Sequence, residues 1–173
     1  MISIGLGCNH YSIGICIENA PPLTEYRQLD SITPLINDEI RSIGQQCGNG
    51  WRKVFNVYAK LLFALPAEKF TFSKLADSWQ DYRDLYLLQA HSKTALLFTP
   101  PVPTTNSIHI IAGRTYAKKL LANTLKVPDL IWLNEEFAIS KNSRLIVSPY
   151  LDYRQLSNIK IEFLVKLINQ INE

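Results

Sequence analysis

Three apolar runs of the sequence each end in residues that could do chemistry. The runs and the segments that follow them are Tyr11–Ile17 with Glu18-Asn19-Ala20-Pro21-Pro22, Ile108–Ala112 with Gly113-Arg114, and Leu145–Val147 with Ser148-Pro149-Tyr150. A carboxylate or an amide can orient a water molecule or hydrogen-bond a ligand, and a guanidinium binds phosphate. The three segments therefore contain the groups needed for hydrolysis or for base recognition, provided that they meet in space.

The apolar runs before these segments have the composition and length of buried strands. Ligands of open α/β sheets bind beyond the carboxyl ends of the strands, so we expect the three segments to share one rim. A last helix follows Leu156-Ser157, with Ser157 as its expected N-cap. Because helix N-termini attract anions, Arg114 and this helix end are expected to hold a phosphate. The amide of Asn19 is expected to position a water molecule or to read the edge of a base.

Helical and strand-like patterns alternate along the rest of the chain. Helices are expected from Thr33 to Cys47, from Trp51 to Leu65, after Thr71 or Ser73, from Arg114 to Thr124 and after Ser157, and further strands over Ala95–Phe98 and Leu130–Leu133. In the second of these helices Trp51 belongs to the apolar stripe, which predicts a packing role. The alternation predicts a single α/β domain over residues 1–173, a three-layer α/β/α sandwich around a largely parallel sheet of about four or five strands.

Composition excludes several classes of protein. Of the 173 residues, 47% are hydrophobic and 19% are charged, so a packed core is expected and general disorder is excluded. Cys8, Cys16 and Cys47 have no paired spacing, which is typical of a reducing cytosol. No apolar run reaches about 18 residues, and no secretory signal pattern is found, so we expect a cytoplasmic protein without a membrane partner.

The net charge of +3 does not by itself indicate a polyanion-binding protein. The basic excess lies in the C-terminal half of the chain, where Lys118, Lys119 and Arg144 are among the cations. Two interpretations stay open: a solubilising surface, or a side of the molecule that faces phosphates.

Several candidate motifs fail on their spacing. Gly5-Leu6-Gly7 lacks a third glycine and precedes a strand, so it does not indicate dinucleotide binding. No pair among Cys8, His10 and Cys16 has the spacing of a zinc site. His109 lies within an apolar run and is expected to be packed. We therefore expect no cofactor and no metal.

From Ile108 to the C-terminus, the chain resembles the closing half of the uracil-DNA glycosylase superfamily, particularly its mismatch-specific branch. The resemblance rests on the segments IIAGRTYAKKL, residues 110–120, and RLIVSPYLDYRQLSN, residues 144–158. In that family a strand and a Gly-Lys or Gly-Arg turn lead into a helix, and a later strand ends in a Pro-Ser loop that finishes in Leu-Ser. The first motif of the family is matched more loosely, by residues 17–22.

The resemblance implies a DNA N-glycosylase-type hydrolase, which flips a damaged base into a pocket and hydrolyses its N-glycosidic bond. Asn19 or Glu18 would hold the attacking water, Ser148 would face the base, and the segment from Tyr150 to Ser157 would press the minor groove. The implied catalytic residues are Asn19, Glu18 and Ser148, and the implied substrate- or phosphate-binding residues are Arg114, Gly113, Pro21, Tyr150, Ser157 and Arg154. The implied partner is DNA, a nucleobase or a nucleotide.

The chain departs from the pattern of this family at several positions, which include a lengthened segment from Tyr150 to Gln155 and Ala20 between Asn19 and Pro21. Ser148 replaces the family's His or Asn, Tyr150 replaces its wedge serine, and no glycine precedes Glu18. Whether the chain is an enzyme therefore stays open, and the alternative is a non-catalytic nucleotide-binding or protein-interaction module on the same scaffold. In that alternative, Asn19 and Pro21 form a turn and Ser157 only caps a helix.

Overall fold

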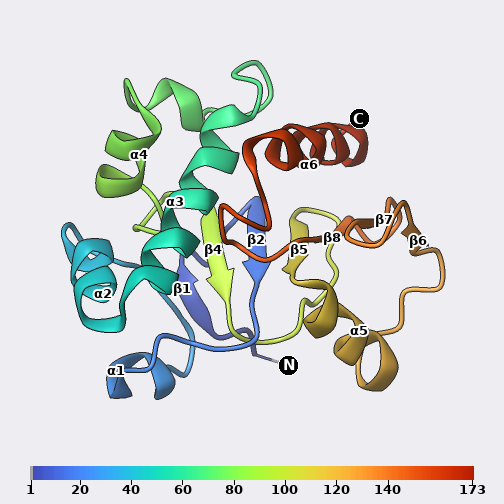
Figure 1. Cartoon of the computed structure of the whole chain (residues 1–173), viewed down its shortest axis with the longest axis horizontal. Coiled ribbons are helices and arrows are strands. Elements are labelled where there is room, and N and C mark those ends of the chain that lie inside the picture. The colour runs from blue at the N-terminus through green and yellow to red at the C-terminus, as the bar shows by residue number, and fades with distance from the viewer. Residues whose placement is uncertain (1) are drawn as a thin grey trace.

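Residues 2–173, which the computed structural model describes, form one eight-stranded sheet and six α-helices (Figure 1). In chain order the elements are β1 (Gly5–Gly7), β2 (Ile13–Cys16), α1 (Thr24–Arg27), β3 (Ile32–Thr33), α2 (Glu39–Cys47), α3 (Asn49–Ala64), a 3-10 turn (Phe72–Lys74), α4 (Trp79–Leu85), β4 (Thr94–Leu97), β5 (Ile108–Ala112), α5 (Arg114–Asn123), β6 (Ile131–Trp132), β7 (Ala138–Ser140), β8 (Leu145–Ser148) and α6 (Asn158–Ile171). The predicted α/β class is confirmed.

The sheet is parallel at its centre and mixed toward its edges, where the edge strand β3 pairs in parallel with β1. Its order is β3-β1-β4-β2-β5-β8-β7-β6. Strands β4, β2, β5 and β8 run parallel, with Ile15 of β2 opposite Leu96 of β4 and Ile110 of β5. Strand β1 is antiparallel to β4, and β7 is antiparallel to β8. The predicted number of four or five strands is too small, because β1, β3 and β7, which were not predicted, have only two or three residues each and give no alternation in the sequence.

Helices cover both faces of the sheet. On one face, Tyr58 of α3 and Leu164 of α6 pack in the same buried cluster as Ile110 of β5. On the other face, Ala117 of α5 packs in a second cluster with Ile111 of β5. Because neighbouring strand residues point to opposite faces, Ile110 and Ile111 contribute to different layers. Helices α1–α4 gather beside β1 and β4, whereas α5 lies beside β5 and β8 (Figure 1).

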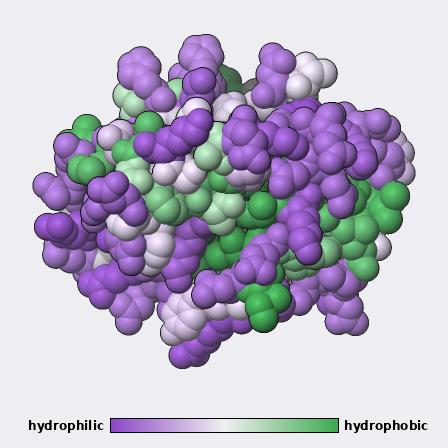
Figure 2. Space-filling view, turned by 90° about the horizontal axis from the view of Figure 1, so that it is seen from above, coloured by the Kyte–Doolittle hydropathy of each residue, from purple (hydrophilic) through white to green (hydrophobic). Residues whose placement is uncertain are grey.

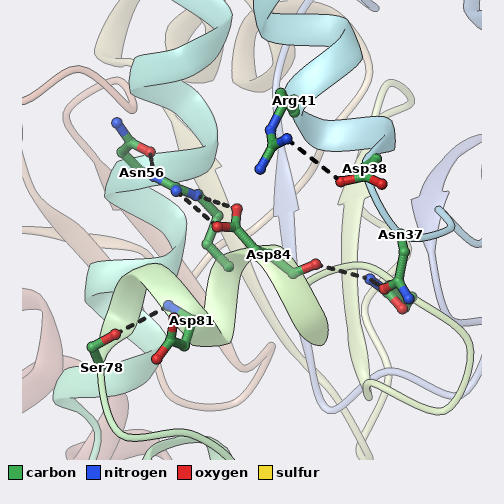
Figure 3. A network of polar contacts seen from close by, with 9 residues as sticks. Asn37, Asp38, Arg41, Asn56, Ser78, Asp81 and Asp84 are labelled. Atoms are coloured by element: carbon green, nitrogen blue, oxygen red, sulfur yellow. Dashed lines mark hydrogen bonds and ion pairs between the residues drawn. The ribbon is translucent and has the colours of Figure 1, made fainter.

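Two expected helix boundaries are wrong. Thr33 pairs with Leu6 in the sheet instead of opening a helix, and α2 begins at Glu39. The helix expected after Thr71 or Ser73 is only a 3-10 turn there. Helix α4 begins further along the chain, where Ser78 accepts a hydrogen bond of 3.1 Å from the backbone N–H of Asp81 (Figure 3). A serine three residues before an acidic residue is the local signal for this start.

The remaining expected elements are confirmed to within a few residues. Strand β5 has the predicted bounds, and α3, α5 and α6 begin within two residues of their predicted starts. Ser157 occupies the N-cap position of α6, although its side chain accepts no capping hydrogen bond. Different methods of assigning a helix commonly place its ends one or two residues apart, so differences of this size do not count against the predicted helices.

Part of the apolar surface of the helices is exposed. Seen from above, apolar groups lie in the middle of the surface, with hydrophilic residues around them (Figure 2). A shallow hollow between α3, α4 and α6 is lined by Phe63, Trp79 and Ile161. Within residues 2–173, no helix combines the length and apolar character that crossing a bilayer requires.

Candidate functional site

A pocket of about 570 Å³ opens beyond the carboxyl ends of β2 and β4. Its lining comes from the segment before β1, the β2–α1 loop, α1 and the residues that follow it, the start of α3, and the residues that follow β4 and β8. These lining residues are Ile4, Glu18, Asn19, Ala20, Pro22, Tyr26, Arg27, Leu29, Trp51, Phe98, Thr99 and Tyr150. Six separate segments of the chain therefore build one hollow.

The topology of the parallel strands explains where this pocket lies. Strand β2 lies between β4 and β5. The chain leaves β2 toward helices that pack on one face of the sheet, and it leaves β5 toward α5 on the opposite face. Such a switch point opens a crevice at the carboxyl ends of the strands, and this is where ligands bind in open α/β sheets.

Aromatic side chains form much of the pocket wall. Tyr26, Trp51, Phe98 and Tyr150 all line it. The hydroxyl of Tyr26 donates a 2.6 Å hydrogen bond to the Glu39 carboxylate, which fixes its ring. Burial and the carboxylate of Asp152 raise the pKa of Tyr150, so Tyr150 stays a neutral hydrogen-bond donor at ordinary pH. Flat, rigid walls of this kind suit a planar ligand.

Polar groups are placed at one side of the same pocket. Glu18 and Asn19 are exposed on the β2–α1 loop. The Glu18 carboxylate lies 3.6 Å from the ammonium group of Lys119, with both side chains largely exposed. Thr99 is held in place because its hydroxyl accepts a 3.2 Å hydrogen bond from the N–H of Ile4. The pocket therefore presents an amide and a carboxylate beside its aromatic walls.

Some of the residues expected from the sequence meet at this pocket. Glu18, Asn19 and Tyr150 all line it. Gly113 lies beside them, since a Cβ built on it would be 3.9 Å from the ring of Tyr150. Pro21 is buried directly before Pro22, which lines the pocket. The first and last of the three predicted segments thus converge.

Other expected residues lie elsewhere. Ser148 is fully buried, and its hydroxyl donates a 2.9 Å hydrogen bond to the carbonyl of Pro149, so it does not line the pocket. Arg114 lines a separate hollow and lies 3.9 Å from Glu135. Arg154 is exposed beside the ring of Tyr153. Ser157 lies at the start of α6. The residues expected to bind phosphate, Arg114, Arg154 and Ser157, therefore do not line this pocket.

Sequence reasoning missed three of the aromatic wall residues. Trp51 was expected to pack, and it does contact Phe55, with the two ring centroids 5.8 Å apart, but it also lines the pocket. Trp51 lies in the first turn of α3, and this position near the end of a helix was the feature of the sequence that could have indicated a place at the pocket. Phe98 follows β4 directly, so the carboxyl-end rule applied to β4 would have found it. Tyr26 lies in a four-residue helix that leaves no periodic pattern.

No metal centre is evident in the described part of the chain. Nowhere in residues 2–173 do three His, Cys, Asp or Glu side chains gather closely enough to hold an ion. The lining of the pocket supplies the amide of Asn19, the carboxylate of Glu18, the guanidinium of Arg27 and aromatic groups.

Comparison with known proteins places the chain in a family. A model of a family of unknown function (DUF6942) matches residues 4–169, so the chain belongs to this family. Searches of curated proteins and of solved structures found no match. All the residues that line the pocket lie within the matched range.

Proposed function

We propose that the pocket beyond β2 and β4 binds a nucleobase, either free or as part of a nucleotide or a DNA strand. The observation that carries this proposal is the combination of four aromatic side chains with the Asn19 amide at the switch point of the sheet. Aromatic faces stack on bases whatever their sequence. An amide can both donate to and accept from the edge of a base.

The resemblance to the uracil-DNA glycosylase superfamily agrees with this proposal at the first motif and at Tyr150. Both segments contribute to the pocket, as the resemblance implies. Ser148 is the point of disagreement, because a hydroxyl bonded to a neighbouring carbonyl has no donor to offer a departing base. Base binding is therefore the first candidate function.

Hydrolysis of an N-glycosidic bond is the second candidate, and the presence of Glu18 and Asn19 in the pocket favours it. Together, a carboxylate and an amide can orient an attacking water. Without a donor from Ser148, the leaving base would lack a preorganised hydrogen bond of the kind that contributes about 10²–10³ in rate. We therefore expect any hydrolysis to be slow.

Calorimetric titration with uracil and with deoxyuridine monophosphate tests base binding. Trp51→Ala and Tyr150→Ala are each expected to weaken binding about tenfold or more, because stacking on an aromatic ring contributes about 1–3 kcal/mol per base. Trp132→Ala is the matched control, since Trp132 lies outside this pocket, on β6. The proposal fails if the unaltered protein binds neither compound, or if all three variants bind like it.

Cleavage assays on uracil-containing and mismatched duplexes test the second candidate separately. If the chain is a glycosylase, Asn19→Ala should slow cleavage while the binding of free uracil persists at a reduced level. If neither the unaltered protein nor Asn19→Ala cleaves these duplexes, or if both cleave them equally fast, the proposal that Asn19 takes part in hydrolysis is wrong. The titrations would then be the test of base binding.

A further inference from the structure

A second pocket, of about 240 Å³, lies between α2, α3 and α4. Three arginines line it, Arg41 from α2, Arg52 from α3 and Arg83 from α4, whereas its lining contains one carboxylate, that of Asp84. Ile40 supplies apolar surface, and the fully buried Phe55 lies beneath the pocket. The pocket is therefore cationic at its walls and apolar at its base.

The single carboxylate is already paired. Arg83 donates from Nε and Nη2 to the two oxygens of Asp84, at 2.8 and 3.1 Å, and from Nη1 to Oδ1 of Asn56 at 2.7 Å. Figure 3 shows Asp84 and Asn56 on neighbouring helices, with Arg41 reaching toward the space beside them. These bonds fix the guanidinium of Arg83 and leave no carboxylate of the pocket for the other two arginines.

Among residues 2–173, the partners of Arg41 and Arg52 are weak or neutral. The Nη1 atom of Arg52 donates to the neutral amide oxygen of Asn49 at 2.8 Å. Arg41 lies 3.9 Å from Asp38 on the exterior of α2, where the two side chains are 68% and 81% exposed. Exposed pairs of this length contribute little. Both guanidinium groups therefore retain donors for an anion.

The packing of α2 on α3 sets the position of Arg52. A Cβ built on Gly44 would lie 2.8 Å from Cγ of Arg52, so the glycine leaves room for the arginine stem to cross α2. Long cationic side chains often bury their stem in this way and present the charged end to solvent. Arg52 is exposed, and it lines the pocket from α3.

We infer that this pocket binds a small organic anion, a phosphate or carboxylate joined to an apolar group. The anion lies against Arg41 and Arg52, whose planar guanidinium groups match phosphate and carboxylate oxygens. The apolar part lies against Ile40, above the buried Phe55. This site is separate from the base-binding pocket, with which it shares no lining residue, and does not depend on the function proposed there.

Calorimetric titrations with phenyl phosphate, benzoate, inorganic phosphate and phenol test this inference. We expect phenyl phosphate or benzoate to bind more tightly than inorganic phosphate, and phenol not to bind, because both the charge and the ring contribute. The tighter of the two aromatic anions identifies the class of anion. Binding of phenol as strong as that of the anions, or no binding of any anion, would overturn the inference.

Three charge-removing variants locate the site. Arg52→Gln and Arg41→Gln are each expected to weaken anion binding about tenfold or more, since each removes charge-assisted hydrogen bonds. Lys166→Gln, on the exposed side of α6, removes one positive charge elsewhere and should leave binding unchanged. Arg41 is largely exposed, so its variant tests the site even if Arg52→Gln disturbs packing. Equal binding by all three variants would show that the anion lies elsewhere.

Discussion

Replacing Gly7 with alanine is expected to destabilise the fold by about 3 kcal/mol, because strain and a backbone clash act together. The φ of Gly7 is +120°, a backbone conformation that residues with a side chain rarely adopt. A Cβ built there would lie 2.2 Å from the carbonyl oxygen of Thr94 and 2.8 Å from Cα of Ala95. Both atoms belong to the backbone of β4, so β1 would have to move away from its neighbour. Chemical denaturation at neutral pH measures the effect.

Gly50→Ala is the matched control for this substitution. Gly50 is exposed in the first turn of α3, and a Cβ built there would meet no atom within 4 Å. Alanine is the better helix former, so we expect stability to be unchanged or raised by up to about 1 kcal/mol. Equal free energies of unfolding for Gly7→Ala and Gly50→Ala would contradict the close approach of β1 to β4.

The second large effect is a loss of stability in weak acid caused by His109. This side chain is fully buried in β5, with its Nε2 atom 2.7 Å from the hydroxyl oxygen of Tyr11. Burial lowers the pKa of His109 to about 4. The unfolded chain, with a histidine pKa of about 6.5, therefore binds a proton that the folded chain refuses between these two values. The free energy of unfolding should fall by about 2 kcal/mol between pH 7 and pH 5.

Denaturation curves at several pH values check this expectation. His109→Gln should lower stability at pH 7, because it disturbs the contact with Tyr11, but it should remove most of the change between pH 7 and pH 5. His10→Asn, at an exposed position before Tyr11, should keep the pH dependence of the unaltered protein. A flat profile for the unaltered protein, or an unchanged slope in His109→Gln, would show that His109 is protonated in the folded state.

The central strands and the longer helices could be predicted because their patterns extend over several residues. Strand β5 is apolar except for His109, and α3 buries one stripe that includes Phe55 and Tyr58. Strand β1 could not be recognised, because Gly5-Leu6-Gly7 has no strand propensity and is held in the sheet by pairing with β4. Strand β3 has only two residues and is defined by its pairing with β1, whereas β6, also of two residues, lies inside the strand predicted over Leu130–Leu133.

Some of the residues that line the pocket could be predicted from the positions at which the strands end. Glu18, Asn19 and Tyr150 were identified because the carboxyl ends of parallel strands meet at one edge. This rule predicts where the ends of the strands lie, but it does not predict in which direction the side chain of a terminal residue points. Ser148 ends β8 opposite Ala112 and is enclosed by the core, whereas Arg114 begins α5 and turns toward Glu135. Their placement depends on packing that the sequence pattern does not reveal.

A crystal structure of the protein soaked with uracil tests the proposed base-binding pocket most directly. We predict that the base lies beyond the ends of β2 and β4, stacked on one of the aromatic walls, with its polar edge hydrogen-bonded to the Asn19 amide. Uracil bound at another site, with this pocket left open to solvent in crystals soaked at saturating concentration, would contradict the proposal.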